Sequence, residues 1–299
     1  MSIWQRKSRG KMLIDSGQAE NLFDIDGIKV EKRKVSLGEY GLFVIGIEEK
    51  ISDKNKKDLL NLCKKENTLF IQIETINYKN KLFDLQKEFS VGYYKKFITP
   101  YTAVIGLDNS EDEILKNMKQ KGRYNIRLAV KKGVVVKEVS KTKENIKEFY
   151  NLMLETTSRD NFFGNKLEFY EVFLNSLENS SLLLAYKGEK VICGGIFIFD
   201  KDVSIYYYGA STSSKEYRNL MAPYLLQWEA IKRAKNYGSV LYDFLGVSEP
   251  NKKNTSLSGV TDFKLKLTKD VRDVSNSYIF VNKRLKYFFI LLLRKLGNI

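Results

Sequence analysis

Three apolar segments joined by two short polar turns follow one another in the second half of the chain. They read SLLLAYKG, KVICGGIFIF and VSIYYYGA and lie within residues 181–210. The turns at residues 187–189 and 200–202 are rich in Lys, Gly and Asp. Connections this short join antiparallel neighbours, because a parallel pair needs a crossover of about a dozen residues or more. The pattern therefore predicts a three-stranded antiparallel meander, which limits the folds open to this chain.

The elements around the meander follow a defined order. The segment VVVKEV, which starts at Val134, has strand character, and helical periodicity covers about 142–158 and 167–178. After the meander come a helix ended by Gly238, in the position that glycine favours after a helix, and the strand VLYDFLGV. Strand, two helices, three-stranded meander, helix and strand is the order of the GNAT acyltransferase fold.

The first half of the chain has a less regular pattern of the same class. Short strands alternate there with helical segments. The expected strands cover 28–35, 41–47, 68–74 and 101–108, and the expected helices about 3–15, 54–65 and 111–122. We expect an α/β (α+β) chain of two tandem GNAT-like domains, 1–133 and 134–299, the second ending in an amphipathic helix. No heptad stretch interrupts 142–284, so we expect no coiled-coil arm.

Composition limits the chemistry. The chain of 299 residues carries 51 Lys and Arg against 36 acidic residues, which favours polyanionic partners, although an ordinary basic protein is an open alternative. The absence of histidine excludes Ser-His-Asp and Cys-His triads and the usual zinc sites. We find no GxGxxG, GxxxxGKS/T or HExxH motif. We therefore expect no metal and no cofactor and, if the protein is a transferase, an acyl group that arrives already activated.

Cysteine use and the N-terminus indicate a compartment. Cys63 and Cys193 lie in apolar surroundings without CxxC spacing, so we expect buried free thiols in a reducing environment. The first residues, MSIWQRKSRGKMLIDSG, lack the continuous apolar stretch of a secretory signal. The expected location is the cytoplasm.

A strongly basic segment spans residues 114–137. It contains eight Lys and Arg and no acidic residue, which is the composition of a surface that contacts a phosphate backbone. We expect Arg123, Arg127, Lys131 and Lys132 to bind nucleic acid. A solvated helix face is the alternative.

A short apolar run, YFFILLL, covers residues 287–293 and is flanked on both sides by Lys and Arg. It is too short to span a bilayer, which takes about 20 residues. It could lie flat on an anionic membrane surface. A helix packed on its own domain is the alternative.

The strand end YYYGAST, residues 206–212, holds three consecutive tyrosines. Strand alternation places Tyr206 and Tyr208 on one face and Tyr207 on the other. Tyr208 stands last before Gly209, at a strand end, where ligands of α/β folds bind. Core packing of these rings is the alternative.

The turn that follows does not suit coenzyme A. The stretch KEYRNLMAPYLLQ has no glycine, whereas a CoA-dependent GNAT enzyme uses a Gly-rich turn there, whose amides bind the diphosphate. Pro223 offers no amide hydrogen. Amides near Asn219 and Met221 could still point at an anion.

The segment SGVTDFKLKLTKD, residues 258–270, alternates apolar residues with lysines. A period-two pattern predicts an exposed strand, with Phe263, Leu265 and Leu267 inward and Lys264 and Lys266 outward. A lysine near an acyl-transfer centre could also place its ammonium against a developing oxyanion.

Five segments together resemble the FemABX family (FemA/FemB/FemX-like), the peptidyltransferases that build the interpeptide bridge of peptidoglycan precursors. The segments are MKQKGRYNIRLAVKKGV, YYYGAS, LMAPYLLQWEAIKRAKNYG, LYDFLGV and GVTDFKLKL. The resemblance implies two GNAT-like domains and transfer of an amino acid from aminoacyl-tRNA to the stem-peptide amine of a UDP-linked or lipid-linked muramyl peptide. The aminoacyl ester is already activated, so no cofactor is required. We expect a monomer in the cytoplasm, with peripheral contact at the inner membrane surface.

The resemblance also implies roles for individual residues. Phe263 and Lys264 match the Phe-Lys pair of the family, whose lysine stabilises the tetrahedral intermediate or orients the tRNA end, and Glu74 falls where relatives have an acidic residue near the acceptor amine. Substrate-binding roles fall on Tyr208, Lys11, Asn165, Lys166 and Phe169. Arg9 stands where the family's N-terminal motif commonly has tryptophan, so the diphosphate contact at Lys11 departs from the pattern.

Two other functions remain open on the sequence alone. One is a CoA-dependent N-acyltransferase of the GNAT fold. The other is a non-catalytic module that binds tRNA or a membrane surface through the basic segments at 116–137 and 283–295.

Overall fold

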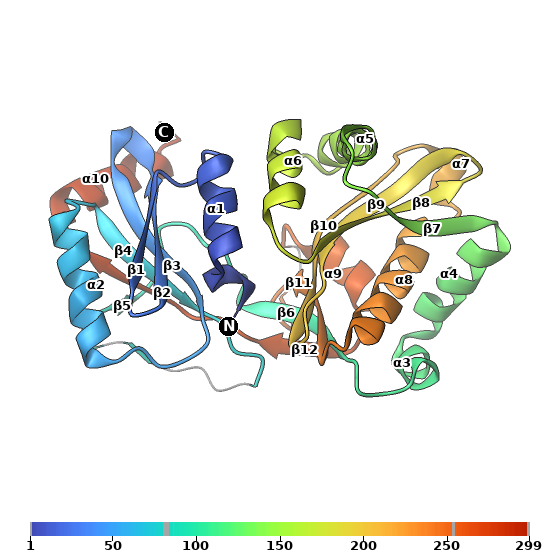
Figure 1. Cartoon of the computed structure of the whole chain (residues 1–299), viewed down its shortest axis with the longest axis horizontal. Helices are drawn as coiled ribbons and strands as arrows, with labels where there is room; N and C mark the ends of the chain where they lie inside the picture. The colour runs from blue at the N-terminus through green and yellow to red at the C-terminus, as the bar shows by residue number, and fades with distance from the viewer. Residues whose placement is uncertain (1, 80–83, 86, 253–254, 298–299) are drawn as a thin grey trace. The chain divides into compact units, whose positions relative to one another are not determined.

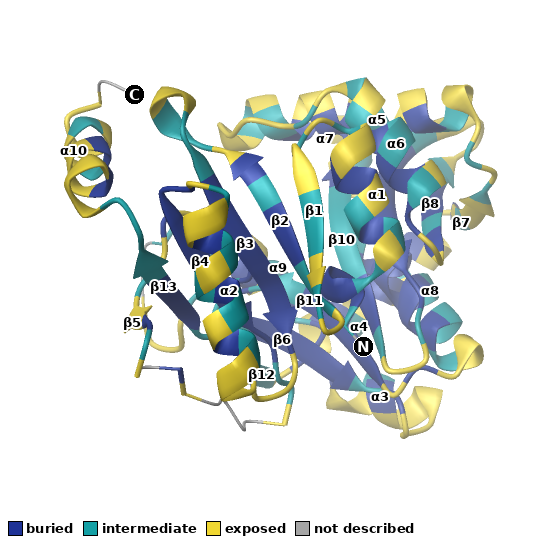
Figure 2. Cartoon of the chain, turned by 60° about the vertical axis from the view of Figure 1, so that its left-hand side comes forward, coloured by how far each residue is buried: buried dark blue, intermediate teal, exposed yellow. Residues whose placement is uncertain are grey.

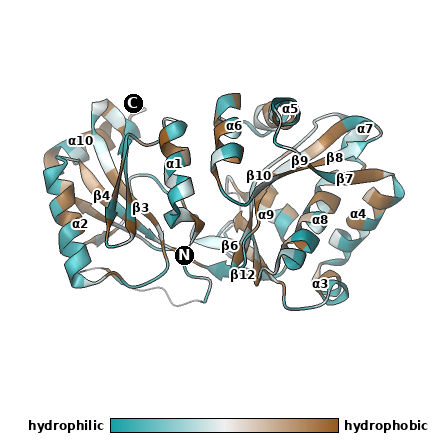
Figure 3. Ribbon diagram, viewed as in Figure 1, coloured by the Kyte–Doolittle hydropathy of each residue, from teal (hydrophilic) through white to brown (hydrophobic). Residues whose placement is uncertain are grey.

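The computed structural model describes residues 2–79, 84–85, 87–252 and 255–297. The chain forms two compact units, one made of Met1–Pro100 with Asp273–Ile299 and the other of Tyr101–Arg272. Both are mixed α/β, and apolar residues gather in the central strands of each sheet (Figure 3). No helix among the described residues is long and apolar enough to cross a bilayer.

Unit 1, the unit that includes both chain ends, has a six-stranded sheet in the order β1-β2-β3-β4-β13-β5. Its strands are β1 (Asn21–Ile25), β2 (Ile28–Lys34), β3 (Tyr40–Ile47), β4 (Phe70–Thr75), β5 (Ser90–Val91) and β13 (Ser277–Val281). Its helices are η1 (Ile3–Gln5), α1 (Lys7–Asp15), η2 (Ser36–Gly38), α2 (Asp53–Lys65) and α10 (Arg284–Lys295). Strand β13 pairs with β4 (Figure 2), so residues about 200 positions later in the sequence complete this sheet.

One face of the unit 1 sheet packs on α2. Leu59 and Cys63 of α2 are fully buried against Val44, Ile71 and Ile73 of the sheet. The helix begins where the Ser52 side chain accepts a hydrogen bond from the Asn55 amide, 3.1 Å away. Its outer face is exposed (Figure 2), as the sequence pattern of 54–65 predicts.

Unit 2 has a seven-stranded sheet in the order β12-β6-β11-β10-β9-β8-β7. Its strands are β6 (Tyr101–Gly106), β7 (Val134–Val139), β8 (Ser180–Lys187), β9 (Lys190–Ile198), β10 (Val203–Ser211), β11 (Leu241–Gly246) and β12 (Asp270–Asp273). Its helices are α3 (Glu111–Asn117), α4 (Gln120–Lys131), α5 (Lys143–Asp160), α6 (Leu167–Ser176), α7 (Lys215–Arg218), α8 (Ala222–Tyr237) and α9 (Ser258–Lys264). Helices α5 and α6 cover one face of the sheet, and α4 and α8 cover the other (Figure 1).

The predicted meander is confirmed as β8, β9 and β10, with antiparallel pairing throughout. The two helices before it are α5 and α6, and α8 ends at Gly238 with φ +87°, as expected for a helix C-terminus. The α/β fold class is confirmed as well. Among the described residues no long helical pair projects as an arm, and the longest helix is α5, with 18 residues.

The bounds of the two units differ from the predicted domains 1–133 and 134–299. Helices α3 and α4 belong to unit 2, because α4 packs on α8 and β7. The C-terminal segment belongs to unit 1, because β13 pairs with β4 and α10 follows it. A boundary read along the sequence misses this return of the chain.

Two local predictions are wrong. The helix expected over 111–122 is broken at Met118, where ψ is 154° and the backbone is extended. The strand expected after β11 is the helix α9, and its Lys264 is buried. The period-two pattern assigned Lys264 and Lys266 to solvent, but Lys264 finds hydrogen-bond acceptors in the interior.

The turn between α3 and α4 packs closely against the turn that follows α9. The Lys119 amide donates to the Lys266 carbonyl at 3.1 Å. A Cβ added to Gly122 would lie 2.2 Å from the same carbonyl oxygen. Glycine at position 122 is therefore required for this contact.

We expect Gly122→Ala to lower the free energy of unfolding of unit 2 by about 1–3 kcal/mol, because the new methyl group overlaps a backbone oxygen. Gly259→Ala is the matched control, since nothing lies within 4 Å of its Cβ position in α9. It should be neutral or stabilise by up to about 1 kcal/mol. Urea unfolding of both variants measures the difference, and equal effects would contradict the contact.

Candidate functional site

Strands β10 and β11 pair over only a short stretch. Their parallel ladder joins Val203–Ile205 to Leu241–Asp243, although β10 continues to Ser211 and β11 to Gly246. On its other side β11 pairs with β6, and the register shifts between Asp243 and Gly246. The end of β11 therefore has backbone groups that need partners other than β10.

Lys264 supplies such a partner. Its ammonium donates to the carbonyls of Leu245 and Gly246, at 3.2 and 2.8 Å. The side chain is buried, and burial lowers the pKa of Lys264 to about 8, partly offset by the carboxylate of Asp243. These two bonds account for two of the three ammonium protons.

Asp243 stabilises the bent backbone at the end of β11. It is buried, accepts a hydrogen bond from the Thr102 hydroxyl and accepts another from the Leu245 amide at 2.7 Å. Leu245 has φ +58°, in the left-handed region that a leucine rarely adopts. The carboxylate thus fixes the bend that turns two carbonyls toward Lys264.

A cation held in this way suits electrostatic catalysis. A lysine with a pKa near 8 is largely protonated at neutral pH, and its buried position strengthens its attraction for a developing negative charge. Phe263, beside it, packs edge-on against Tyr224 of α8 with ring centroids 5.0 Å apart. This contact fixes α9 against the core of unit 2.

The three tyrosines of β10 do not alternate as predicted. Tyr206 pairs with Phe197 and Tyr208 with Ile196, so Tyr207 is an extra residue in a β-bulge. Because consecutive residues of β9 face opposite sides, Tyr206 and Tyr208 do so as well. Tyr206 packs in the core on the α8 side.

Tyr208 lies in a cluster of rings on the α6 side of the sheet. Its ring centroid is 6.2 Å from Phe169, 5.4 Å from Tyr170 and 5.5 Å from Phe173. Burial raises the pKa of Tyr170, and hydrogen bonds with Asn165 oppose this rise. The structure thus brings four predicted substrate-binding residues together at the start of α6: Tyr208, Phe169, Asn165 and the exposed Lys166.

The start of α8 offers little to an anion. The Met221 amide donates to the Arg218 carbonyl at 3.3 Å, and the Leu220 amide to that of Tyr217 at 3.0 Å. Met221 has φ +58°, and Pro223 occupies the first turn. These amides stabilise the turn itself, so the expectation that amides near Met221 could point at an anion gains no support.

Helix α4 carries the predicted basic surface. Arg127, Lys131 and Lys132 are exposed, beside Tyr124, which is 60% exposed. Arg123 differs, because it is half-buried and donates to the carbonyls of Met118 and, at 3.1 Å, Lys116. Arg123 therefore closes the end of α3, and the other three side chains are available to a partner.

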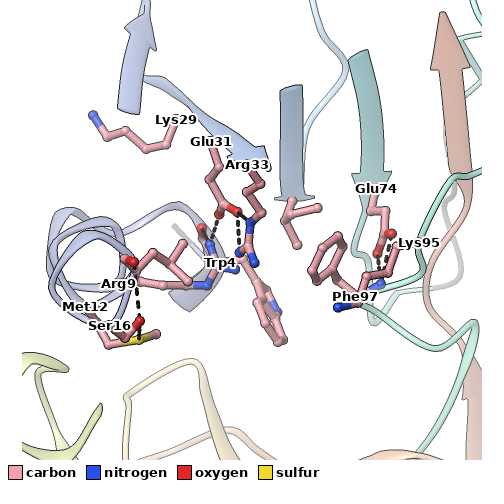
Figure 4. Close-up of polar contacts among 12 residues, drawn as sticks. Trp4, Arg9, Met12, Ser16, Lys29, Glu31, Arg33, Glu74, Lys95 and Phe97 are labelled. Atoms are coloured by element: carbon pink, nitrogen blue, oxygen red, sulfur yellow. Dashed lines mark hydrogen bonds and ion pairs between the residues drawn. The ribbon is translucent and has the colours of Figure 1, made fainter. Parts of the chain in front are cut away.

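Glu74 lies in unit 1, at the end of β4. Its carboxylate accepts hydrogen bonds from the amide of Phe97, at 3.0 and 3.1 Å (Figure 4). It also accepts from the amide of Ile98, at 2.6 Å, and from the Gln72 side chain, at 2.7 Å. Burial raises the pKa of Glu74 to about 7 despite these donors. Since the donors occupy the carboxylate, it chiefly positions the segment that contains Phe97.

The N-terminal motif forms a buried ion cluster in unit 1. Glu31 accepts from the Arg9 guanidinium and from that of Arg33, the latter at 2.6–2.8 Å (Figure 4). The Arg9 guanidinium also lies 5.1 Å from the Trp4 ring centroid, and Arg33 lies 4.6 Å from that of Phe97. Lys11, by contrast, is exposed on α1 and pairs with Asp15. Arg9, at the position where the family motif has tryptophan, is thus a structural residue.

Each unit holds its own part of the predicted site. Unit 2 contains Phe263 and Lys264, the ring cluster around Tyr208 and the basic face of α4. Unit 1 contains Glu74 and Lys11. Among the described residues, no group of three His, Cys, Asp or Glu side chains could hold a metal ion.

Asp243 and Thr102 belong to the β11 strand end but were not predicted from the sequence. The signal for Asp243 was present, because an aspartate within the apolar strand YDFLGV must find buried donors. Thr102 had no comparable signal, since threonine is common in strands.

Comparison with known proteins gives consistent matches. The model of the FemAB family matches residues 50–188 and 177–295. A lipid II:glycine glycyltransferase of Staphylococcus epidermidis is 24% identical over 298 residues, covering 72% of this chain and 70% of that protein. The protein of the same name from Staphylococcus haemolyticus is 23% identical over 260 residues, covering 64% and 61%.

Two solved structures have a similar fold. FemX has a TM-score of 0.76 at 17% identity, covering 97% of this chain and 94% of that one. L-PGS from Bacillus licheniformis has a TM-score of 0.60 at 16% identity, covering 95% and 90%. At these identities the similarity concerns the fold.

We expect Asp243→Asn to move the titration of Lys264 from about pH 8 to lower pH, because the variant loses the charge that favours the ammonium form. NMR of protein with isotope-labelled lysine side chains follows this titration. Thr102→Val removes a hydrogen bond to the same carboxylate but keeps the charge of Asp243. The pKa of Lys264 in this variant should therefore stay within about half a pH unit of its original value. An unchanged titration in Asp243→Asn would contradict the assignment.

Proposed function

The chain belongs to the FemAB family, and we propose that it transfers an amino acid from aminoacyl-tRNA to the stem-peptide amine of a peptidoglycan precursor. The observation that carries this proposal is the buried ammonium of Lys264, held by two carbonyls at the end of β11. The family and fold expected from the sequence are confirmed.

The names of the relatives favour a lipid-linked acceptor. The staphylococcal proteins are lipid II:glycine glycyltransferases, and a precursor of that kind brings its enzyme to the membrane surface. We propose that this chain adds to the interpeptide bridge on a muramyl peptide, lipid-linked in preference to UDP-linked. A monomer in peripheral contact with the cytoplasmic face of the membrane fits this acceptor.

The proposed reaction requires no external activation. The acceptor amine attacks the ester carbonyl carbon of the aminoacyl-tRNA, a C–N bond forms and the ester C–O bond breaks. The ribose oxygen leaves with the proton that the amine gives up. Negative charge develops on the carbonyl oxygen in between, and we assign its stabilisation to the Lys264 ammonium, with Phe263 fixing its helix.

We propose binding roles for the remaining residues. The ring cluster of Tyr208 and Phe169, with Asn165 and Lys166 at its edge, is suited to the peptide and sugar of the acceptor. Lys11 is exposed on α1 and suited to a diphosphate. Glu74 positions the segment around Phe97, and only a carboxylate released from its donors would accept the amine proton.

A CoA-dependent reaction finds less support. The amides at the start of α8 are used within their own turn, so a diphosphate there would lack donors. Acyl-CoA should therefore show no binding by calorimetry.

We expect Lys264→Ala to reduce transfer of a labelled amino acid from charged tRNA to lipid II by at least about 100-fold, because removing one electrostatic stabiliser typically costs that much. Mass spectrometry of the muramyl peptide measures the product. Lys266→Ala is the control, since it removes a neighbouring lysine that is more exposed.

RNase treatment of the charged tRNA should abolish the transfer. Transfer that resists RNase would overturn tRNA as the donor. Salt-sensitive tRNA binding without any turnover would instead favour the non-catalytic module.

We expect Arg127→Glu with Lys131→Glu to weaken tRNA binding about tenfold or more and to reduce its salt dependence, because two phosphate contacts are lost. The matched control reverses Lys57 and Lys65, which are exposed on α2. Filter binding over a range of salt concentrations tests this. Equal losses in both variants would indicate a general charge effect and contradict a surface on α4.

A further inference from the structure

Helix α10 attaches to unit 1 through one side. Tyr287 and Ile290 are buried there, and the Tyr287 ring lies edge-on to Phe70 at a centroid distance of 5.8 Å. Arg294 donates to the Tyr94 carbonyl at 3.1 Å and lies 4.4 Å from the Tyr94 ring centroid. Contacts at both ends of the helix therefore fix which side faces outward.

The outward side of α10 is an apolar stripe. Leu285 is 91% exposed, Phe288 63%, Phe289 55%, Leu292 55% and Leu296 63%. At 3.6 residues per turn these five side chains fall within an arc of about 100°. We call these five residues the α10 stripe. Five large apolar side chains on one exposed face of a fixed helix mark an interaction surface.

Positive charge borders the stripe. No acidic residue occurs from Val274 to Ile299. The helical period places Arg284 and Lys295 along one edge of the stripe and Lys286 along the other. Lys283 and Lys286 contact Glu39 at 3.0 and 2.5 Å, which holds the start of the helix to the sheet.

The charge decides between possible occupants. A second copy docked on the same stripe would bring two basic borders together, and like charges repel. Lys286 already pairs with Glu39, but a neutral apolar partner would offer Arg284 and Lys295 no group of opposite charge. An anionic bilayer satisfies both features, since its acyl region takes Leu and Phe side chains while its headgroups take Lys and Arg.

We propose that the α10 stripe lies in the surface of an anionic membrane, with the helix axis parallel to the bilayer plane. The buried side of α10 stays on unit 1, so the whole of that unit is held at the lipid surface. The surface lies on unit 1 alone and does not depend on Lys264 or on tRNA.

The test is co-sedimentation with vesicles of phosphatidylglycerol and phosphatidylcholine, compared with vesicles of phosphatidylcholine alone. We expect binding to the anionic vesicles that weakens with added salt. Phe288→Ser with Leu292→Ser should lower it about tenfold or more, and Arg284→Gln with Lys295→Gln should lower it only on anionic vesicles.

Matched controls separate this surface from general effects. Phe163→Ser with Val240→Ser removes two exposed apolar side chains of unit 2, 105% and 66% exposed, and should leave vesicle binding unchanged. Transfer to a water-soluble acceptor measures the reaction separately from lipid binding. The proposal would be overturned if Phe288→Ser with Leu292→Ser left vesicle binding unchanged, or if the protein bound neutral vesicles equally well. A dimer that dissociates in this variant would also overturn it.

Discussion

The early separation of β10 from β11 is the constraint on which the candidate site depends. Two parallel strands that part after three paired residues leave carbonyls without a ladder partner. The protein satisfies them with an ammonium, and it supports that ammonium with a buried carboxylate that also holds the left-handed residue Leu245. Water molecules could also donate hydrogen bonds to these carbonyls, but they carry no charge. Because a buried lysine donates instead, the strand end carries a positive charge that a regular sheet does not have.

Buried charge in unit 1 has a different character. Glu31 lies between two arginines, and Glu74 is surrounded by amide donors, so each carboxylate fixes elements that are distant in sequence. Removing one partner of such a group leaves an uncompensated charge, which costs more than the intact pair contributes. These groups therefore specify one arrangement of α1, β2 and the segment around Phe97.

Sequence patterns predicted the regular elements well and the irregular ones poorly. Alternation and short turns identified the meander, and the glycine after α8 identified its end, because both depend on local backbone preferences. The bulge at Tyr207 and the inward lysine of α9 were missed, since each depends on partners that are distant in the chain. The family resemblance selected Lys264, Tyr208 and Phe169, and the structure adds how Asp243 and Thr102 support the first of these.

The insertion of β13 beside β4 bears on how the chain acquires its structure during synthesis. Thr75 and Asn276 exchange hydrogen bonds of 3.0 Å across 201 residues of sequence. Unit 2 is built from one uninterrupted segment, whereas the β4 edge stays unpaired until residues 277–281 have left the ribosome, about 200 residues later. Such non-local pairing is slow, and an unpaired edge invites aggregation in the interval. The nascent protein therefore has a vulnerable period that ends only when β13 has paired with β4.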